Sequence, residues 1–337
     1  MQHLNKIMFS SSLIIGTSIA MSSYSWVGMW MGLEINLLSF IPLIIKKNNI
    51  FTSEAALKYF ITQAIASTVL LFSIISLSMI SMYLIELKSP LITVLKTSLL
   101  LKMGAAPFHF WFPEVMEGLS WPSGLILLTW QKIAPMILFI YINKNLLFIS
   151  FIIISCMLIS GIMGQNQLSL RKIMAYSSIN HIGWMIASSL MSEAIWMFYF
   201  TIYSIISINI VLMFKILNIF YLKQLILTST KNSSLKLFFM LNFLSLGGLP
   251  PLLGFFPKWL TIQALTEKNM FMVTALMIIL TLLTLYFYLQ VMYSSTILST
   301  SLIIHNLDNM KNNFFITSSN FLTISGLIFM TILFNYS

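Results

Sequence analysis

The chain is a succession of apolar runs separated by short polar connections, and nearly every run is long enough to cross a bilayer, which takes about twenty residues. Lipid offers no partner to a backbone polar group, so such runs cross it as helices. Charged residues make up only 8% of the sequence, against about 25% in soluble domains. We therefore predict an all-α polytopic membrane protein without a separate soluble domain.

The apolar runs predict about eleven membrane helices. The first run follows Lys6 and resembles a short signal peptide, but the chain re-enters an apolar run at Tyr24, which favours a retained helix. Glu54 and Lys58, near the third helix, have the i,i+4 spacing of a surface ion pair. The expected helices cover 7–21, 24–45, 57–83, a fourth segment around Lys102, 122–143, 146–164, 173–190, 194–220, 235–265, 271–294 and 314–334, with a partly amphipathic surface connection over 295–313.

Lys102 stands midway along an apolar run, five residues before Pro107. An ammonium at the bilayer centre costs roughly 2.5–3.5 kcal/mol on insertion scales, so this side chain is not expected to face lipid. Pro107 lacks a backbone donor and clashes with the preceding turn, so we expect the helix to bend or break there. The run predicts a hydrated ion site inside the membrane. The alternative is a proline kink that serves packing, with Lys102 snorkelling to the interface.

Two further ionisable side chains lie near the middle of predicted helices. Glu34 is either paired with a base or held neutral, because burial disfavours a lone carboxylate; the alternative is a protonated structural glutamate beside Asn36. Lys132 lies halfway along the fifth helix, three residues before Pro135. A short loop makes the fourth and fifth helices antiparallel neighbours, so Lys102 and Lys132 are expected at similar depth. Two lysines so placed repel as cations, which favours a proton relay.

A second interrupted helix is expected over 235–265, a run longer than a bilayer needs. It contains Gly-Gly-Leu-Pro-Pro at 247–251, and glycines and prolines at this density interrupt a helix. Lys258 follows this break. His181 lies in the polar first half of the seventh helix, and an imidazole suits proton transfer near neutral pH. The alternative is that His181 is a buried packing residue whose ring nitrogens are hydrogen-bonded. No second histidine or carboxylate stands at metal-ligand spacing from it.

The two interrupted helices are each the fourth in a successive group of five. Because five is odd, the two groups enter the membrane from opposite sides, and interrupted segments at matching positions are typical of inverted-repeat transporters. We therefore predict a single membrane domain over 1–337, with a first repeat over 1–145, a second over 146–294, and a connecting segment with one extra helix over 295–337.

The loop charges predict the orientation of the chain. With eleven helices, nine basic residues fall on the N-terminal side and three on the other, which places the N-terminus on the inner face. The nine are Lys6, Lys46, Lys47, Arg171, Lys172, Lys223, Lys231, Lys236 and Lys311, and the three are Lys88, Lys144 and Lys268. The net charge of +10 thus comes from loop lysines and does not indicate nucleic acid binding. The single cysteine, Cys156, excludes an internal disulfide and a cysteine-ligated cluster.

Five motifs, in this order, resemble those of the NADH:ubiquinone oxidoreductase chain 2 family in its short animal mitochondrial form. They are Trp-Met-Gly-Leu-Glu-Ile-Asn-Leu at 30–37, Lys-Met-Gly-Ala-Ala-Pro-Phe-His-Phe-Trp at 102–111, Leu-Thr-Trp-Gln-Lys at 128–132, Ser-Ser-Ile-Asn-His-Ile-Gly-Trp at 177–184, and the glycine- and proline-rich block at 247–259. The resemblance covers essentially the whole chain. It implies a proton-translocating, antiporter-like subunit in the membrane arm of respiratory complex I, which lies in the mitochondrial inner membrane with the N-terminus in the matrix and the C-terminus in the intermembrane space.

The resemblance also implies roles for six residues. Glu34 and Lys102 correspond to an ion pair, Lys132 to a central relay lysine and Lys258 to a distal lysine, although some antiporter-like relatives have glutamate at that last position. His109 and His181 match family histidines and are candidate relay residues. Lys88 and Lys96 match no motif.

The implied partners are other membrane-arm subunits, especially the antiporter-like chain 4 and the small chain 4L, together with accessory subunits and lipids, and no nucleic acid. No cofactor or metal is implied in this chain, since FMN, iron–sulfur clusters and ubiquinone belong to other subunits. One alternative is a stand-alone cation/proton antiporter of the same ancestry. The other is a non-conducting structural spacer, against which stand four ionisable residues at membrane depth.

Overall fold

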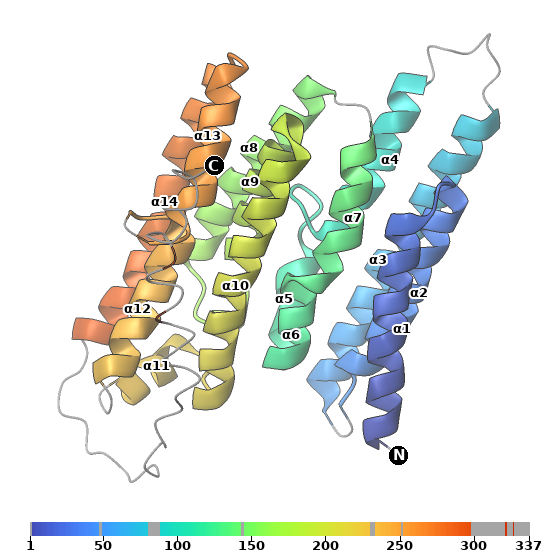
Figure 1. Cartoon of the computed structure of the whole chain (residues 1–337). Helices are drawn as coiled ribbons and strands as arrows, with labels where there is room; N and C mark the ends of the chain where they lie inside the picture. The colour runs from blue at the N-terminus through green and yellow to red at the C-terminus, as the bar shows by residue number, and fades with distance from the viewer. Residues whose placement is uncertain are drawn as a thin grey trace. The chain divides into compact units, whose positions relative to one another are not determined.

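The computed structural model describes residues 2–46, 49–79, 88–142, 145–229, 233–250 and 252–297, together with Phe321 and Gly326. Over these residues the chain is helical, without a named strand (Figure 1). It divides into two compact units, Met1–Ser155 and Cys156–Ser337, and each unit is taken by itself. The expected all-α fold is confirmed.

The first unit contains seven helices and the beginning of an eighth. They are α1 (Gln2–Ser22), α2 (Trp26–Ile44), α3 (Ile50–Met79), α4 (Lys88–Met103), α5 (Trp111–Gly118), α6 (Trp121–Leu128), α7 (Trp130–Tyr141) and α8 (Leu146–Gln165), of which α8 passes the boundary between the units. The second unit contains α9 (Leu170–Met191), α10 (Glu193–Leu217), α11 (Leu222–Ser229), α12 (Ser233–Gly247), α13 (Phe255–Glu267) and α14 (Phe271–Ile297).

Six described segments are long and apolar enough to cross a membrane, so the chain is a multi-pass membrane protein. They are Trp26–Ile44, Ile50–Met79, Trp121–Tyr141, Leu146–Gln165, Glu193–Leu217 and Phe271–Tyr293. Of the connection expected over 295–313, the first three residues extend α14 and the rest lies outside the described residues. The last expected helix, over 314–334, also lies outside them apart from Phe321 and Gly326. The count of about eleven helices and the repeat layout therefore stay predictions.

Small residues bring α1 and α2 into backbone contact. A Cβ on Gly32 of α2 would clash with the backbone of Ala20 in α1, and a Cβ on Gly16 would lie 2.9 Å from the Asn36 nitrogen. Close approach of this kind is how small residues hold helices together in a membrane, where lipid gives no hydrophobic driving force. These contacts hold α2 against α1 at Gly32 and Asn36, which stand on either side of Glu34 in the sequence.

The expected break after Lys102 is present, but it begins at Gly104 rather than at Pro107. Gly104 has a φ of +74°, its N–H donates to the Leu101 carbonyl at 3.2 Å, and the Ala105 N–H donates to the Leu100 carbonyl at 3.0 Å. This is the Schellman motif, in which a left-handed glycine closes a helix. The chain then runs without helix to Trp111, and Pro107 lies inside that gap.

The second break ends its helix in the same way. Gly248 has a φ of +76°, its N–H donates to the Ser245 carbonyl at 3.0 Å, and the Leu249 N–H donates to the Leu244 carbonyl at 3.2 Å. The next helix, α13, begins at Phe255. The two interrupted helices of the sequence thus end in the same backbone motif.

The helix expected over 122–143 is present as the membrane-crossing segment Trp121–Tyr141. Within it Thr129, with a φ of −114° and a ψ of −69°, separates α6 from α7, although its N–H still donates to the Leu125 carbonyl at 3.0 Å. Pro135, three residues after Lys132, lies inside the continuous helix α7. The loop expected over 221–236 contains the short helix α11. An antiparallel bridge between Ser169 and Tyr221 joins its start to the connection before α9.

Candidate functional site

Lys102 lies one residue before the end of α4, and its side chain is 6% exposed. Its backbone carbonyl accepts a hydrogen bond from Gln63 Nε2 of α3 at 3.3 Å. The neighbouring Leu101 carbonyl accepts one from the Trp111 indole of α5 at 3.1 Å. A helix end leaves such carbonyls without helical partners, and here side chains of α3 and α5 replace them. The non-helical backbone beside Lys102 is therefore satisfied by protein, as a membrane interior requires.

Glu34 reaches the same region from α2. It is half-buried, and it lies close enough to Lys102 and to Tyr59 of α3 for its charge to act on both. The ion pairs within 4.0 Å among the described residues do not include Glu34 with Lys102. The structure thus brings the two predicted residues into electrostatic range without direct contact, and the ion pair itself stays a prediction.

Lys132 is 1% exposed in the first turn of α7. Its ammonium nitrogen lies 5.5 Å from the centre of the Phe112 ring in α5, within the range of a cation–π contact. The preceding residue, Gln131, donates from Nε2 to Asn36 Oδ1 at 3.1 Å, a buried bond between α7 and α2. Helix α4 also packs against α7. Lys132 therefore belongs to the helix cluster that holds Glu34 and Lys102.

His109 lies inside the break between α4 and α5 and is 2% exposed. Its Nδ1 is 3.2 Å from the Pro107 carbonyl oxygen, and its ring lies 4.5 Å from that of Phe110. A hydrogen bond to that carbonyl has Nδ1 as the donor. The contact orients the imidazole within the break.

Lys258 lies in the first turn and a half of α13 and is 6% exposed. Its ammonium donates to the Gly247 carbonyl at 2.8 Å and to the Leu246 carbonyl at 3.3 Å, which are the last carbonyls of α12. The nitrogen also lies 5.7 Å from the centre of the Trp184 ring in α9. As the sequence predicts, this lysine follows the second break, and the structure shows that it closes the broken helix end directly.

His181 sits in the middle of a helix that is buried all round, since every residue from Ile173 to Leu190 is buried. Its Nδ1 lies 2.9 Å from the Tyr199 hydroxyl of α10, and its ring centre lies 5.0 Å from that of Tyr203. Trp184, one turn further along α9, is the ring that contacts Lys258. In the second unit, α9 thus carries both His181 and Trp184, whose ring contacts Lys258.

Several polar contacts at these places were not predicted from the sequence. Gln131 and Asn36 stand inside two of the recognised motifs, so their position was a usable signal. Gln63 and Tyr59 carried no such signal, because their roles depend on which face of α3 meets α4. Lys96, which matches no motif, is fully buried in α4.

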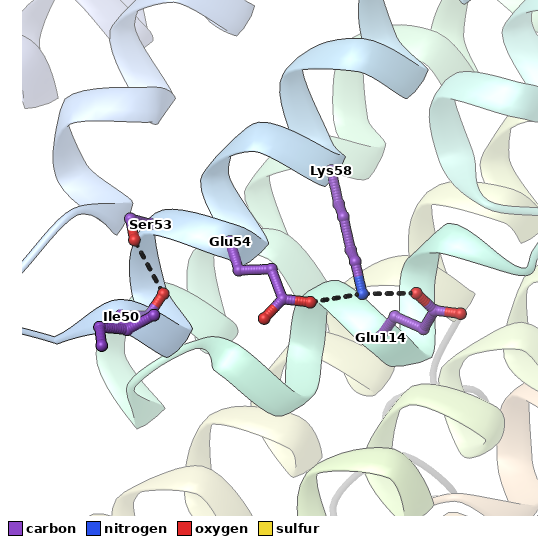
Figure 2. Close-up of polar contacts among 5 residues, drawn as sticks. All are labelled: Ile50, Ser53, Glu54, Lys58 and Glu114. Carbon is purple, nitrogen blue, oxygen red and sulfur yellow. Dashed lines mark hydrogen bonds and ion pairs between the residues drawn. The ribbon is translucent and has the colours of Figure 1, made fainter.

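The surface pair predicted at the start of the third helix is confirmed and has a third member. Lys58 Nζ lies 2.9 Å from Glu54 Oε1 and 2.9 Å from Glu114 Oε2 of α5 (Figure 2). All three side chains are about half-exposed. The cluster ties the beginning of α3 to the helix that follows the first break.

A family model described as NADH:quinone oxidoreductase/Mrp antiporter matches residues 23–284 of the chain. The NADH-ubiquinone oxidoreductase chain 2 of Anopheles gambiae is 50% identical over 339 residues, which cover 99% of this chain and 99% of the relative. The protein of the same name from Locusta migratoria is 47% identical over 293 residues, which cover 87% and 86%.

Two solved structures have the same fold. A chain of respiratory complex I from Thermus thermophilus matches with a TM-score of 0.84 and 22% identity, over 96% of this chain and 78% of that chain. A chain of the membrane-bound sulfane sulfur reductase, an archaeal respiratory membrane complex, matches with a TM-score of 0.82 and 14% identity, over 97% and 73%. At these identities the likeness concerns the fold alone.

Proposed function

Since the chain belongs to the NADH-ubiquinone oxidoreductase chain 2 family, we propose that it is a proton-translocating membrane-arm subunit of respiratory complex I. The chain takes part in the enzyme without redox chemistry of its own. Each charge that crosses against the membrane field requires about 2.3 kcal/mol per 100 mV. Electron transfer from NADH to ubiquinone on other subunits supplies this energy, and FMN, iron–sulfur clusters and the quinone are held there.

The observation that carries the proposal is a buried lysine at a helix break with a carboxylate in electrostatic range. Lys102 and Glu34 have this relationship in the first unit. We infer that the two form an ion pair in one state of the cycle. When a charge moves in a neighbouring subunit, Glu34 turns away, and Lys102, without its anion, releases a proton more readily.

Lys132 receives the proton in this proposal. It is buried in the first turn of α7, and the Phe112 ring lies 5.5 Å from its ammonium nitrogen, a cation–π contact that stabilises the protonated form. Lys258, a buried lysine beside the second break, is proposed to complete the path. His109 and His181 are proposed as relay residues, since each imidazole is buried and oriented by a hydrogen bond.

We propose two inverted repeats, 1–145 and 146–294, followed by a connecting segment and one extra helix. The matching glycine-closed ends of α4 and α12 support this division. We further propose the mitochondrial inner membrane as location, with the N-terminus in the matrix and the C-terminus in the intermembrane space. The nine-to-three distribution of basic residues supports that orientation. Labelling of loops 46–49, 165–172 or 221–236 from the intermembrane space in intact mitochondria would contradict it.

The proposed partners are the other membrane-arm subunits, with chain 4 and chain 4L as neighbours, and with accessory subunits and lipids around them. A stand-alone cation/proton antiporter is the second candidate, and the family description, which includes Mrp antiporters, favours it over a structural spacer. The two are separated by purification. The proposed subunit is recovered with its partner chains and supports no transport alone, whereas an antiporter exchanges cations for protons in vesicles without them.

The test of the conducting role replaces the lysines in the intact complex. Lys102→Met and Lys132→Met remove the titratable group and keep much of the side-chain volume, and methionine adapts to irregular packing. We expect normal assembly, with quinone reductase activity and proton uptake both strongly reduced. Lys215→Met, at the exposed end of α10, is the matched control and should change neither. Parental pumping by the first two variants would exclude the conducting role and favour a structural spacer.

A further inference from the structure

One carboxylate oxygen of Glu34 is buried without a donor. No hydrogen bond reaches Oε2 from any residue in the ranges that the structure describes. A charged oxygen in that condition inside a membrane protein is costly, and the cost is removed when a donor approaches. Glu34 therefore needs a donor in every state in which it is ionised.

Tyr59 of α3 has the burial and the fixed ring that such a donor requires. It is 3% exposed, and its ring lies edge-on to Phe40 of α2 at 5.2 Å and tilted against Trp111 of α5 at 5.9 Å. These two rings hold the phenol between α2 and the helix that follows the break. The Tyr59 hydroxyl makes no hydrogen bond to another residue in the described part of the chain, so it is available to a new acceptor.

The same face of α3 touches the backbone of Lys102. Gln63 stands four residues after Tyr59, which places both side chains on one side of the helix. Gln63 Nε2 donates to the Lys102 carbonyl at 3.3 Å. The charge of Glu34 thus acts on a cationic donor of α4, Lys102, and on a neutral donor of α3, Tyr59.

We propose that Tyr59 is a positioning residue whose hydroxyl binds the Glu34 carboxylate when Lys102 has released its proton. The inference rests on the proposed proton path and adds an alternate partner to its ion-pair switch. While Lys102 is protonated, its ammonium pairs with Glu34. When the proton passes to Lys132, the phenol O–H donates to the carboxylate in its place. Tyr59 keeps its own proton throughout, so no proton is added to or lost from the path.

The consequence is that the ionised glutamate is stabilised in both states of the switch. Without the hydroxyl, release of the proton from Lys102 leaves Glu34 without any donor, and this state becomes less populated. A hydrogen bond to a charged group is worth enough for its loss to slow the coupled step about tenfold.

The experiment replaces Tyr59 with Phe in the assembled complex. Phe keeps the ring contacts with Phe40 and Trp111 and removes only the hydroxyl. We expect parental assembly and an about tenfold slower coupled turnover. We also expect a shift of the Glu34 carboxylate band in the redox-induced infrared difference spectrum, where that band is assigned by its loss in Glu34→Gln. Tyr141→Phe, at the exposed end of α7, is the matched control and should leave rate and band unchanged.

A double variant separates this role from a packing role. If Tyr59 acts through Glu34, then Tyr59→Phe combined with Glu34→Gln is no slower than Glu34→Gln alone, because the two changes remove one interaction. Independent, multiplied effects, or an unshifted Glu34 band, would overturn the inference. If Lys102→Met abolishes pumping while Tyr59→Phe is silent, the inference fails and the proposed function stands. If Lys102→Met is also silent, the proposed function itself fails.

Discussion

Gly248 leaves open the space in which the Lys258 side chain lies. A Cβ on Gly248 would be 2.7 Å from Lys258 Cδ and 3.0 Å from its Nζ. The glycine also has a φ of +76°, which it adopts without a steric penalty. One residue therefore both ends α12 and admits the lysine that caps it.

Gly248→Ala is predicted to destabilise this break and displace Lys258. The left-handed conformation costs a non-glycine residue about 1–2 kcal/mol, and the new methyl group adds a clash. The assembled complex should unfold at lower temperature and turn over more slowly. Gly124→Ala in α6 is the control, since its Cβ would meet only the flexible end of Met116 at 3.3 Å. Equal melting and equal activity of both variants would contradict the prediction.

Gln131→Leu is predicted to cost about 1–3 kcal/mol of stability, because it leaves Asn36 Oδ1 buried without its donor from α7. Replacing both residues with leucine should recover most of the loss, since no buried polar atom of the pair then lacks a partner. Thermal unfolding of the purified complex measures both changes. A double variant less stable than the single one would show that the bond between α2 and α7 is not the cause.

Tyr199→Phe is predicted to release the His181 imidazole from the hydroxyl that now lies 2.9 Å from its Nδ1. The ring contact remains, so assembly should be preserved, with a stability loss of about 1 kcal/mol. If His181 relays protons, proton uptake per assembled complex should fall together with quinone reduction. Tyr286→Phe, on the exposed side of α14, supplies the control. Unchanged proton uptake would assign His181 to packing.

Lys58→Met is predicted to have little effect, although Figure 2 shows Lys58 between two carboxylates. The three side chains are about half-exposed, and ion pairs of this kind contribute about 0.2–1 kcal/mol. What remains of the contribution should shrink as salt is raised, since exposed charges are screened. Melting curves at low and high ionic strength test this. A loss of several kcal/mol would show that the contact between α3 and α5 is essential.

Hydropathy predicted most of the fold, because an apolar run that crosses lipid must satisfy its backbone hydrogen bonds internally and therefore forms a helix. The breaks were predictable too, since glycine and proline act through their own backbone chemistry. The interruption at Thr129 was not, because a threonine inside an apolar run does not by itself end a helix, as Thr62 in the continuous helix α3 shows.

The candidate site, too, was predictable from the sequence only in part. Lysines inside apolar runs are visible in any sequence, but their surroundings are not. Lys96 and Lys215 both stand in such runs, and the structure buries the first completely while exposing the second. The contacts of Gln63 and Tyr59 depend on the rotation of α3 about its axis, which a helix apolar on nearly all sides does not specify.

The glycine-closed end of α12 gives Lys258 a counter-charge that no acidic side chain has to supply. The peptide dipoles of a helix sum to about half a negative elementary charge at its C-terminus. The Lys258 ammonium lies on that terminus, bonded to its last two carbonyls. Backbone carbonyls therefore stabilise the charge of the Lys258 ammonium, and a mutation that replaces a carboxylate would leave this stabilisation in place. Only a change in the helix end itself would alter it.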